Sequence, residues 1–135
     1  MVLSNAQWFA NAGADAYSVG NSAMLEDGDS EYLTQTFNKA PTNQKKFTIS
    51  AWYKRGNLGA GEALFGAVGA SATTGRVQVY FDSSDHLVYE IYHGSGWFTI
   101  KTTQVFRDPH AWYNIMCVYD IDNGTSADKM RVLRS

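Results

Sequence analysis

The stretch that decides the fold is Trp112–Asp120, which reads WYNIMCVYD. It is an aromatic and apolar run long enough to cross a sheet, and an acidic turn closes it. Its expected partner is Phe47–Lys54, FTISAWYK, in which apolar residues alternate with more polar positions, as in a half-buried strand. Two such strands in one small chain predict a β-sandwich.

The composition supports a strand-rich globular domain. At 135 residues the chain is one domain, able to bury roughly two-thirds of the surface that its unfolded state exposes. Its 44% hydrophobic and 14% aromatic content, with 12 glycines and 2 prolines, argues against a helical bundle or a disordered segment. A net charge of -2 excludes a basic surface for nucleic acid. The single cysteine, Cys117, lies mid-strand, so we expect a buried core residue.

The sequence shows no membrane-targeting segment. No run approaches the ~18 apolar residues of a membrane span, and Met1–Asn5 lacks the charged and apolar regions of a secretion signal. We therefore expect no membrane insertion. The absence of a cysteine pair fits the cytoplasm, and it equally fits a virion protein that is assembled in a bacterial cytoplasm and later exposed outside.

Turn residues divide the chain into about eight expected strands. In addition to the two strands above, they are 32–37, 63–68, 76–81, 87–92, 97–106 and 129–133. Short loops separate 76–81, 87–92 and 97–106, so these three should form an antiparallel meander. Gly56–Gly61 lacks the ending of a phosphate-binding loop and is predicted to be a flexible corner.

Five motifs support a resemblance to a known family. They are DGDSEYLTQT at 27–36, FTISAWYKR at 47–55, LFGA at 64–67, TTQVFRDP at 102–109 and WYNI at 112–115. Together they resemble the laminin-G-like or concanavalin A-like jelly-roll family, in the version found in tail-fibre and other virion proteins of bacteriophages. The resemblance covers about residues 24–132. It implies an all-β fold, an antiparallel β-sandwich of the concanavalin A-like jelly-roll type, in a virion or in a secreted or extracellular protein.

The resemblance implies two parts of the chain. Residues 1–23 would be an N-terminal segment that packs on the sandwich or on a neighbour. Apart from the resemblance, the residues themselves suggest that Ser4 could cap a short helix through Ala10. Residues 24–135 would be the jelly-roll domain. Family members continue after the strand at 129–133 with a Tyr-Val-Asn-Gly turn and further strands, whereas this sequence stops at Ser135. Either the sandwich lacks its last strands or another chain supplies the missing edge, which would favour a homo-oligomer.

Three aromatic residues are candidate ligand contacts. Trp52 lies on the polar side of its strand, and Tyr92 and Trp97 flank the expected hairpin His93–Gly96. Aromatic side chains combine a flat apolar surface with a polar edge, so these three could stack on the sugar rings of a host surface glycan. The alternative is packing, against a loop, the N-terminal segment or another virion protein, which is the commoner fate of exposed aromatics.

One acidic loop is the candidate metal site. Asp120, Asp122 and Asn123 supply the oxygen ligands that calcium prefers, although the loop lacks the distal glutamate of helix-flanked calcium loops. Laminin-G-like domains often hold calcium at a rim loop, and the resemblance therefore supports calcium here. The alternative is that these residues simply form a turn. We expect no cofactor to be required.

The sequence offers little for catalysis. A glycosidase needs two carboxylates that flank the scissile bond. Glu90 is the one acid inside a clear strand, with no partner on its face, and the alternating acids of Asp27–Glu31 fall in a turn. The histidines, at 86, 93 and 110, lie at separate strand ends without the spacing of zinc ligands.

These observations predict a non-enzymatic domain of a phage virion, from a tail-fibre or capsid-associated protein, that binds a host glycan. Binding would be weak at each site and strengthened by multivalency on an oligomer. The runner-up is a structural assembly module that contacts other virion subunits. A glycoside hydrolase is a third alternative, which the missing carboxylate pair disfavours.

Overall fold

The computed structural model describes residues 23–25, 31–36, 39, 42–43, 45–69, 75–93 and 96–134. The chain divides into two units, Met1–Ala40 and Pro41–Ser135. The described strands all lie in the second unit. They are β1 (Lys46–Lys54), β2 (Glu62–Val68), β3 (Arg76–Phe81), β4 (His86–His93), β5 (Gly96–Val105), β6 (Trp112–Asp120) and β7 (Met130–Arg134), with a short 3-10 helix, η3 (Ser126–Asp128), before β7.

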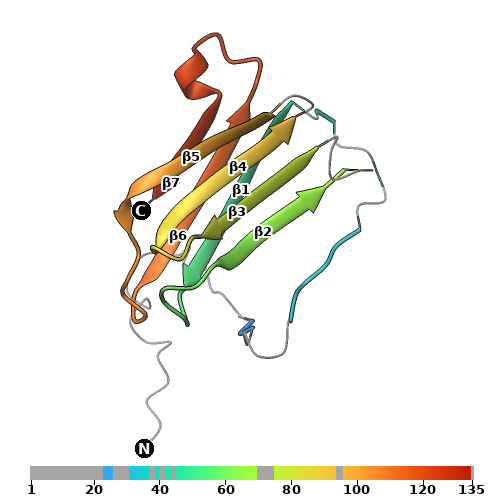
Figure 1. Cartoon of the computed structure of the whole chain (residues 1–135). Coiled ribbons are helices and arrows are strands. Elements are labelled where there is room, and N and C mark those ends of the chain that lie inside the picture. Colours follow the sequence, from blue (N-terminus) through green and yellow to red (C-terminus); the bar gives the residue numbers. More distant parts are fainter. Residues whose placement is uncertain are drawn as a thin grey trace, which may run out of the picture. The chain divides into compact units, whose positions relative to one another are not determined.

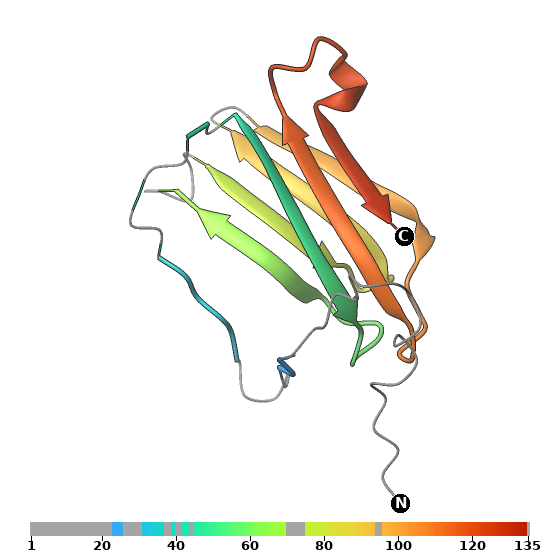
Figure 2. The same ribbon diagram turned by 180° about the vertical axis from the view of Figure 1, so that it is seen from behind.

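The strands of the second unit form two antiparallel sheets. One sheet has three strands in the order β1-β6-β7, and the other has four in the order β2-β3-β4-β5. Figure 1 shows the four-stranded sheet in front, and Figure 2, seen from behind, shows the three-stranded sheet in front. The predicted antiparallel β-sandwich is confirmed, as is the meander of β3, β4 and β5.

β1 and β6 pair with each other along their whole length. β1 runs antiparallel to β6, with Ile49 opposite Cys117 and Tyr53 opposite Tyr113. Paired residues of two strands point to the same face of a sheet. The odd-numbered residues of both strands therefore face the four-stranded sheet, and the even-numbered residues form the outer face.

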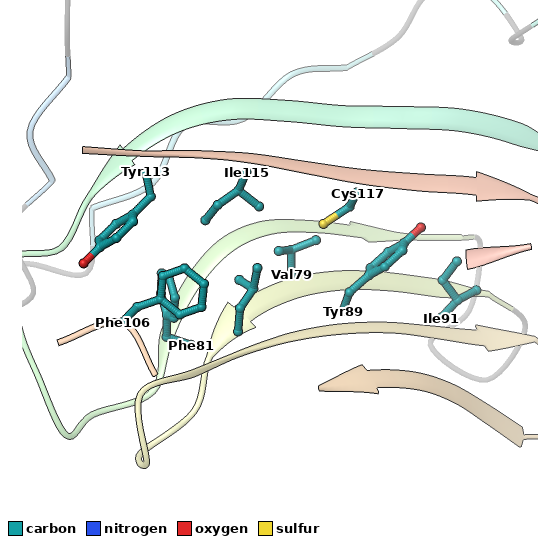
Figure 3. Packing of buried hydrophobic residues seen from close by; sticks show 9 residues of the cluster. Val79, Phe81, Tyr89, Ile91, Phe106, Tyr113, Ile115 and Cys117 are labelled. Atoms are coloured by element: carbon teal, nitrogen blue, oxygen red, sulfur yellow. The ribbon is translucent and has the colours of Figure 1, made fainter. Parts of the chain in front are cut away.

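The core fills the space between the sheets (Figure 3). Tyr89 of β4 and Cys117 of β6 are fully buried there, on facing sheets. At the other end, the ring of Phe106 lies 5.1 Å from that of Tyr113 and 5.3 Å from that of Phe81. Burying a large apolar side chain contributes about 1.5–3 kcal/mol. The expectation for Cys117 is confirmed, and burial raises the pKa of its thiol to about 12, which keeps it unreactive.

The turn between β3 and β4 shows how the polar residues of the sequence set the register. Asp82 Oδ1 accepts hydrogen bonds from the backbone N–H groups of Ser84 and His86, at 2.9 and 3.0 Å. Asp85 adopts a left-handed conformation with φ of 65°, which aspartate tolerates better than most residues. The turn therefore closes with no glycine.

One expected strand is absent. Residues 31–36 carry no strand, and the side chains of Tyr32 and Leu33 are largely exposed. A strand needs a hydrogen-bonded neighbour, and no described segment pairs with these residues. The expectations for Phe37, for residues 1–22 and for the helix begun by Ser4 lie outside the described residues.

Candidate functional site

The outer face of the four-stranded sheet brings together polar and aromatic side chains that the sequence distributes over three strands. Because directly paired residues share a face, the register of β3, β4 and β5 arranges them in rows. We call these nine residues the outer-face site. Its first row is Tyr80, Val88 and Lys101, its central row is Gln78, Glu90 and Thr99, and its third row is Arg76, Tyr92 and Trp97.

The central row is held together by hydrogen bonds. Gln78 Nε2 donates to Glu90 Oε2 at 2.6 Å, and Thr99 Oγ1 donates to Glu90 Oε1 at 3.2 Å. Burial, and then the adjacent Glu90 carboxylate, raise the pKa of Tyr80, so its hydroxyl stays protonated at neutral pH. A carboxylate can accept about four hydrogen bonds. Glu90 is thus fixed in place and keeps capacity to accept hydrogen bonds from a ligand.

The third row is aromatic. The rings of Tyr92 and Trp97 lie 5.2 Å apart at an angle of 54°, and Trp97 is 48% exposed. The structure therefore brings together these two of the three predicted ligand contacts. Arg76 begins the same row, with its side chain exposed.

An ion pair lies at the border of the first row. Lys101 Nζ lies 2.5 Å from Asp82 Oδ2, and its hydrogen bond holds the pKa of Asp82 down to about 2. The Asp82 carboxylate is therefore charged at neutral pH, and Lys101 is its ionic partner. Val88 is 3% exposed although it points to the outer face, between Tyr80 and Lys101 in the paired strands. The floor of this row is thus apolar at Val88.

Trp52 lies on the outer face of the other sheet. It is 60% exposed and pairs with Asn114 of β6, while Trp112, 56% exposed, pairs with Lys54. Leu133 of β7 is 49% exposed on the same face. The structure therefore separates Trp52 from Tyr92 and Trp97. Sequence reasoning missed Trp112, which the alternation of β6 places on that face.

The predicted metal ligands lie at the β6–β7 loop, where other groups of the protein contact them. Asp120 Oδ1 is 3.1 Å from Lys46 Nζ, and Asp122 Oδ1 is 3.6 Å from Lys45 Nζ. Asn123 Oδ1 accepts a hydrogen bond from the backbone N–H two residues later, at 2.9 Å. Among the described residues no group of three or more His, Cys, Asp or Glu side chains is arranged to hold a metal ion.

A buried charge network joins the two sheets, and sequence reasoning did not find it. The side chain of Arg55, which follows β1, is fully buried. Its Nη1 donates to Asp85 Oδ1 at 2.7 Å and to the carbonyl of Phe106 at 2.9 Å. Its Nε donates to Glu62 Oε2 at 3.0 Å, and its Nη2 to the carbonyl of Asn57 at 2.8 Å. One cation thus ties the end of β1 to β2 and to the β3–β4 turn.

Asp85 is the anionic centre of this network. It accepts hydrogen bonds from the backbone N–H of Gly59 and from Arg107 Nε, each at 2.8 Å, as well as from Arg55. These donors, Gly59 first, hold the pKa of Asp85 well below its usual range. Gly59 has a φ of +73°, where side chains are strained. The loop predicted to be a flexible corner is therefore tied to the opposite sheet.

The outer-face site does not present the carboxylate pair of a glycosidase. Such enzymes place two carboxyl groups about 5–10 Å apart across the scissile bond. Within the three rows Glu90 is the acid, and both of its oxygens are hydrogen-bonded. Asp82 at the border is paired with Lys101, and its lowered pKa is opposite to what a general acid needs.

The residues that the structure describes contain no helix long and apolar enough to cross a membrane.

The family model of a laminin-G-type domain, described as the concanavalin A-like lectin/glucanases superfamily, matches residues 26–131. Neither the curated proteins nor the solved structures gave a match to this chain. The matched range contains β1 to β6 and the first two residues of β7. The chain therefore belongs to the concanavalin A-like lectin/glucanase superfamily.

Proposed function

We propose that this domain is a non-enzymatic, glycan-binding part of a bacteriophage virion, in a tail fibre or a capsid-associated protein, that attaches to the host surface. The observation that carries the proposal is the ring pair of half-buried Tyr92 and exposed Trp97 beside the hydrogen-bonded row of Glu90. The superfamily supports a carbohydrate-binding or structural β-sandwich module. The virion setting rests on the sequence motifs.

The proposed mechanism combines stacking with hydrogen bonding. The ring faces of Tyr92 and Trp97 would cover the apolar face of a sugar, and Glu90 would accept hydrogen bonds from its hydroxyls. Because Gln78 and Thr99 already hold Glu90 in place, little conformational entropy is lost on binding. A shallow face still gives weak binding, so attachment would depend on several copies in a homo-oligomer.

A glycan array probed with the full chain in the presence of calcium tests this proposal. We expect binding to one class of sugar, and we expect Trp97→Ala to weaken it at least about tenfold while the fold, measured by circular dichroism, is unchanged. Trp52→Ala is the matched control, since it removes an exposed tryptophan from the other sheet. The losses are compared as affinities per site, by calorimetric titration with the sugar that the array identifies, so that a change in oligomeric state does not affect them. A silent array from folded protein would overturn the proposal, and so would equal losses in the two variants.

A second candidate function is assembly with other virion subunits. It is favoured by the outer face of the three-stranded sheet, where Trp52, Trp112 and Leu133 are exposed together. Large apolar patches on a domain surface mark interfaces. Sedimentation of the full chain should then show oligomers that Trp52→Ala dissociates and Trp97→Ala leaves intact. A monomer at all concentrations tested would contradict assembly through this face by the chain alone.

A further inference from the structure

We infer that the outer-face site binds a sugar acid, a pyranose that carries a carboxylate, and that Arg76 is the residue that binds its carboxylate. This inference rests on the proposed function and specifies the class of sugar. It comes from the third row of the site, where a cation and two aromatic rings lie side by side on neighbouring strands.

Arg76 is exposed and open to a ligand. It begins β3, directly opposite Tyr92 of β4 on one side and Val68 of β2 on the other. In the part of the chain that the structure describes, no carboxylate forms an ion pair with its guanidinium. Lys101, the other cation of the site, is paired with Asp82. Among the described residues, the charge of Arg76 thus has no direct ionic partner.

Glu90 lies on the same face as Arg76 and is therefore a candidate ion-pair partner for it. It lies diagonally across the β3–β4 pair, two residues along β4 from Tyr92. However, each of its two oxygens accepts a hydrogen bond within the central row, from Gln78 and from Thr99. These bonds orient the carboxylate along its own row and leave the guanidinium of Arg76 available.

The spacing of the third row suits one sugar unit and its carboxylate. Adjacent strands lie about 4.8 Å apart, so roughly 10 Å of sheet separates the backbone at Arg76 from that at Trp97, with Tyr92 between them. A ring that lies over Tyr92 and Trp97 can therefore reach Arg76 with a substituent. Guanidinium groups bind carboxylates through two parallel hydrogen bonds, which suits an acid on that substituent.

The two charged residues then select opposite ends of the ligand. Arg76 favours the carboxylate, whereas the Glu90 carboxylate repels an anion and accepts hydrogen bonds from hydroxyls. A sugar with an acid at one end and free hydroxyls at the other satisfies both residues. A neutral sugar leaves Arg76 without a partner.

Calorimetric titration of the full chain with two matched pairs of saccharides tests the inference. One pair is 3′-sialyllactose and lactose, the other is digalacturonate and galactobiose, so the two arms distinguish a sialic acid from a uronic acid. We expect the acidic member of at least one pair to bind about tenfold or more tightly, the usual gain from a charged hydrogen-bonded partner. Arg76→Gln should abolish that preference, and Arg76→Lys should retain part of it.

Arg131→Gln is the matched control, because Arg131 is also exposed but lies on the outer face of the three-stranded sheet. It should leave the preference unchanged. Equal losses in Arg76→Gln and Arg131→Gln would mean non-specific attraction of anions and would overturn the inference. Neutral sugars that bind as well as the acidic ones, through Trp97, would overturn it and leave the proposed function standing. A wider array that stays silent would overturn both.

Discussion

The two outer faces of this sandwich differ in the interactions that their side chains make. On the four-stranded sheet, polar groups bond to each other around Glu90, and two aromatic rings stand beside them. On the three-stranded sheet, Trp52, Trp112 and Leu133 are exposed together. A prearranged polar face suits a hydrated ligand such as a sugar, whereas exposed apolar side chains gain most from contact with another protein.

The exposed tryptophans of this fold are not equivalent. Trp97 lies in a row that also supplies a cation, and the adjacent row supplies a fixed carboxylate. Trp52 has Asn114 opposite it and Trp112 diagonally beside it. Hydrogen-bonding groups around an aromatic ring give it selectivity for a sugar, and aliphatic and aromatic neighbours give it contact area.

Arg55→Met should have the largest effect, because the network supports both faces at once. Removing one partner of a buried ion pair leaves buried carboxylates uncompensated and costs about 3–5 kcal/mol. We expect a loss of this size in the free energy of unfolding from urea titration, with glycan binding and association lost together. Arg107→Gln is the control, because Arg107 contacts the same Asp85 from an exposed position and should cost less than about 1 kcal/mol. A stable Arg55→Met protein would contradict the role assigned to the network.

Acid should weaken the domain through Asp82 and Asp85. Both carboxyls have a lower pKa in the folded protein than the usual value near 4 in an unfolded chain. Their contribution to stability is therefore complete above about pH 5 and is lost as the pH falls toward 2. The urea midpoint should fall over this range, and the fall should be smaller in Asp85→Asn. An equal fall in that variant would show that other groups cause the acid sensitivity.

The sandwich could be predicted because local sequence patterns identify its strands. The alternation in β1 and the apolar run in β6 identify their buried faces without knowledge of any partner. A strand was wrongly expected at 32–37, of which residues 32–36 are described, because these residues too are rich in strand-forming side chains, Tyr32 and Leu33 among them. Composition alone does not supply the neighbouring strand that pairing needs.

The site could be predicted only in part, since its rows run across strands rather than along them. Tyr92 and Trp97 were found because a short hairpin joins them. Arg76 and Gln78 lie on the same face because of the register between β3 and β4, and no local sequence pattern predicts that register. The Arg55 network was missed for the same reason, because Arg55 and Asp85 are 30 residues apart. Such contacts depend on which loops the topology brings together.

Glu90→Ala should weaken the function of one outer face and leave that of the other unchanged. Removing an acceptor that a sugar hydroxyl uses costs about tenfold in affinity, and it also frees Gln78 and Thr99 to move. We expect weaker glycan binding in calorimetric titration and an unchanged sedimentation profile. Asn114→Ala removes a polar side chain from the other face and serves as the control. Glycan affinity that is unchanged in Glu90→Ala would remove the central row from the binding mechanism.

Calcium should have the smallest effect on the stability of the domain. It would act at the β6–β7 loop of the three-stranded sheet. We propose weak binding by Asp120, Asp122 and Asn123, since Lys46 and Lys45 already lie against the two carboxylates and compete with the ion. At a calcium concentration near a millimolar Kd, mass action adds about 0.4 kcal/mol, or roughly 1–2 °C in Tm. Differential scanning calorimetry in calcium and in chelator measures this shift. Asp122→Asn should abolish it, whereas identical melting in the two buffers would remove the loop as a metal site.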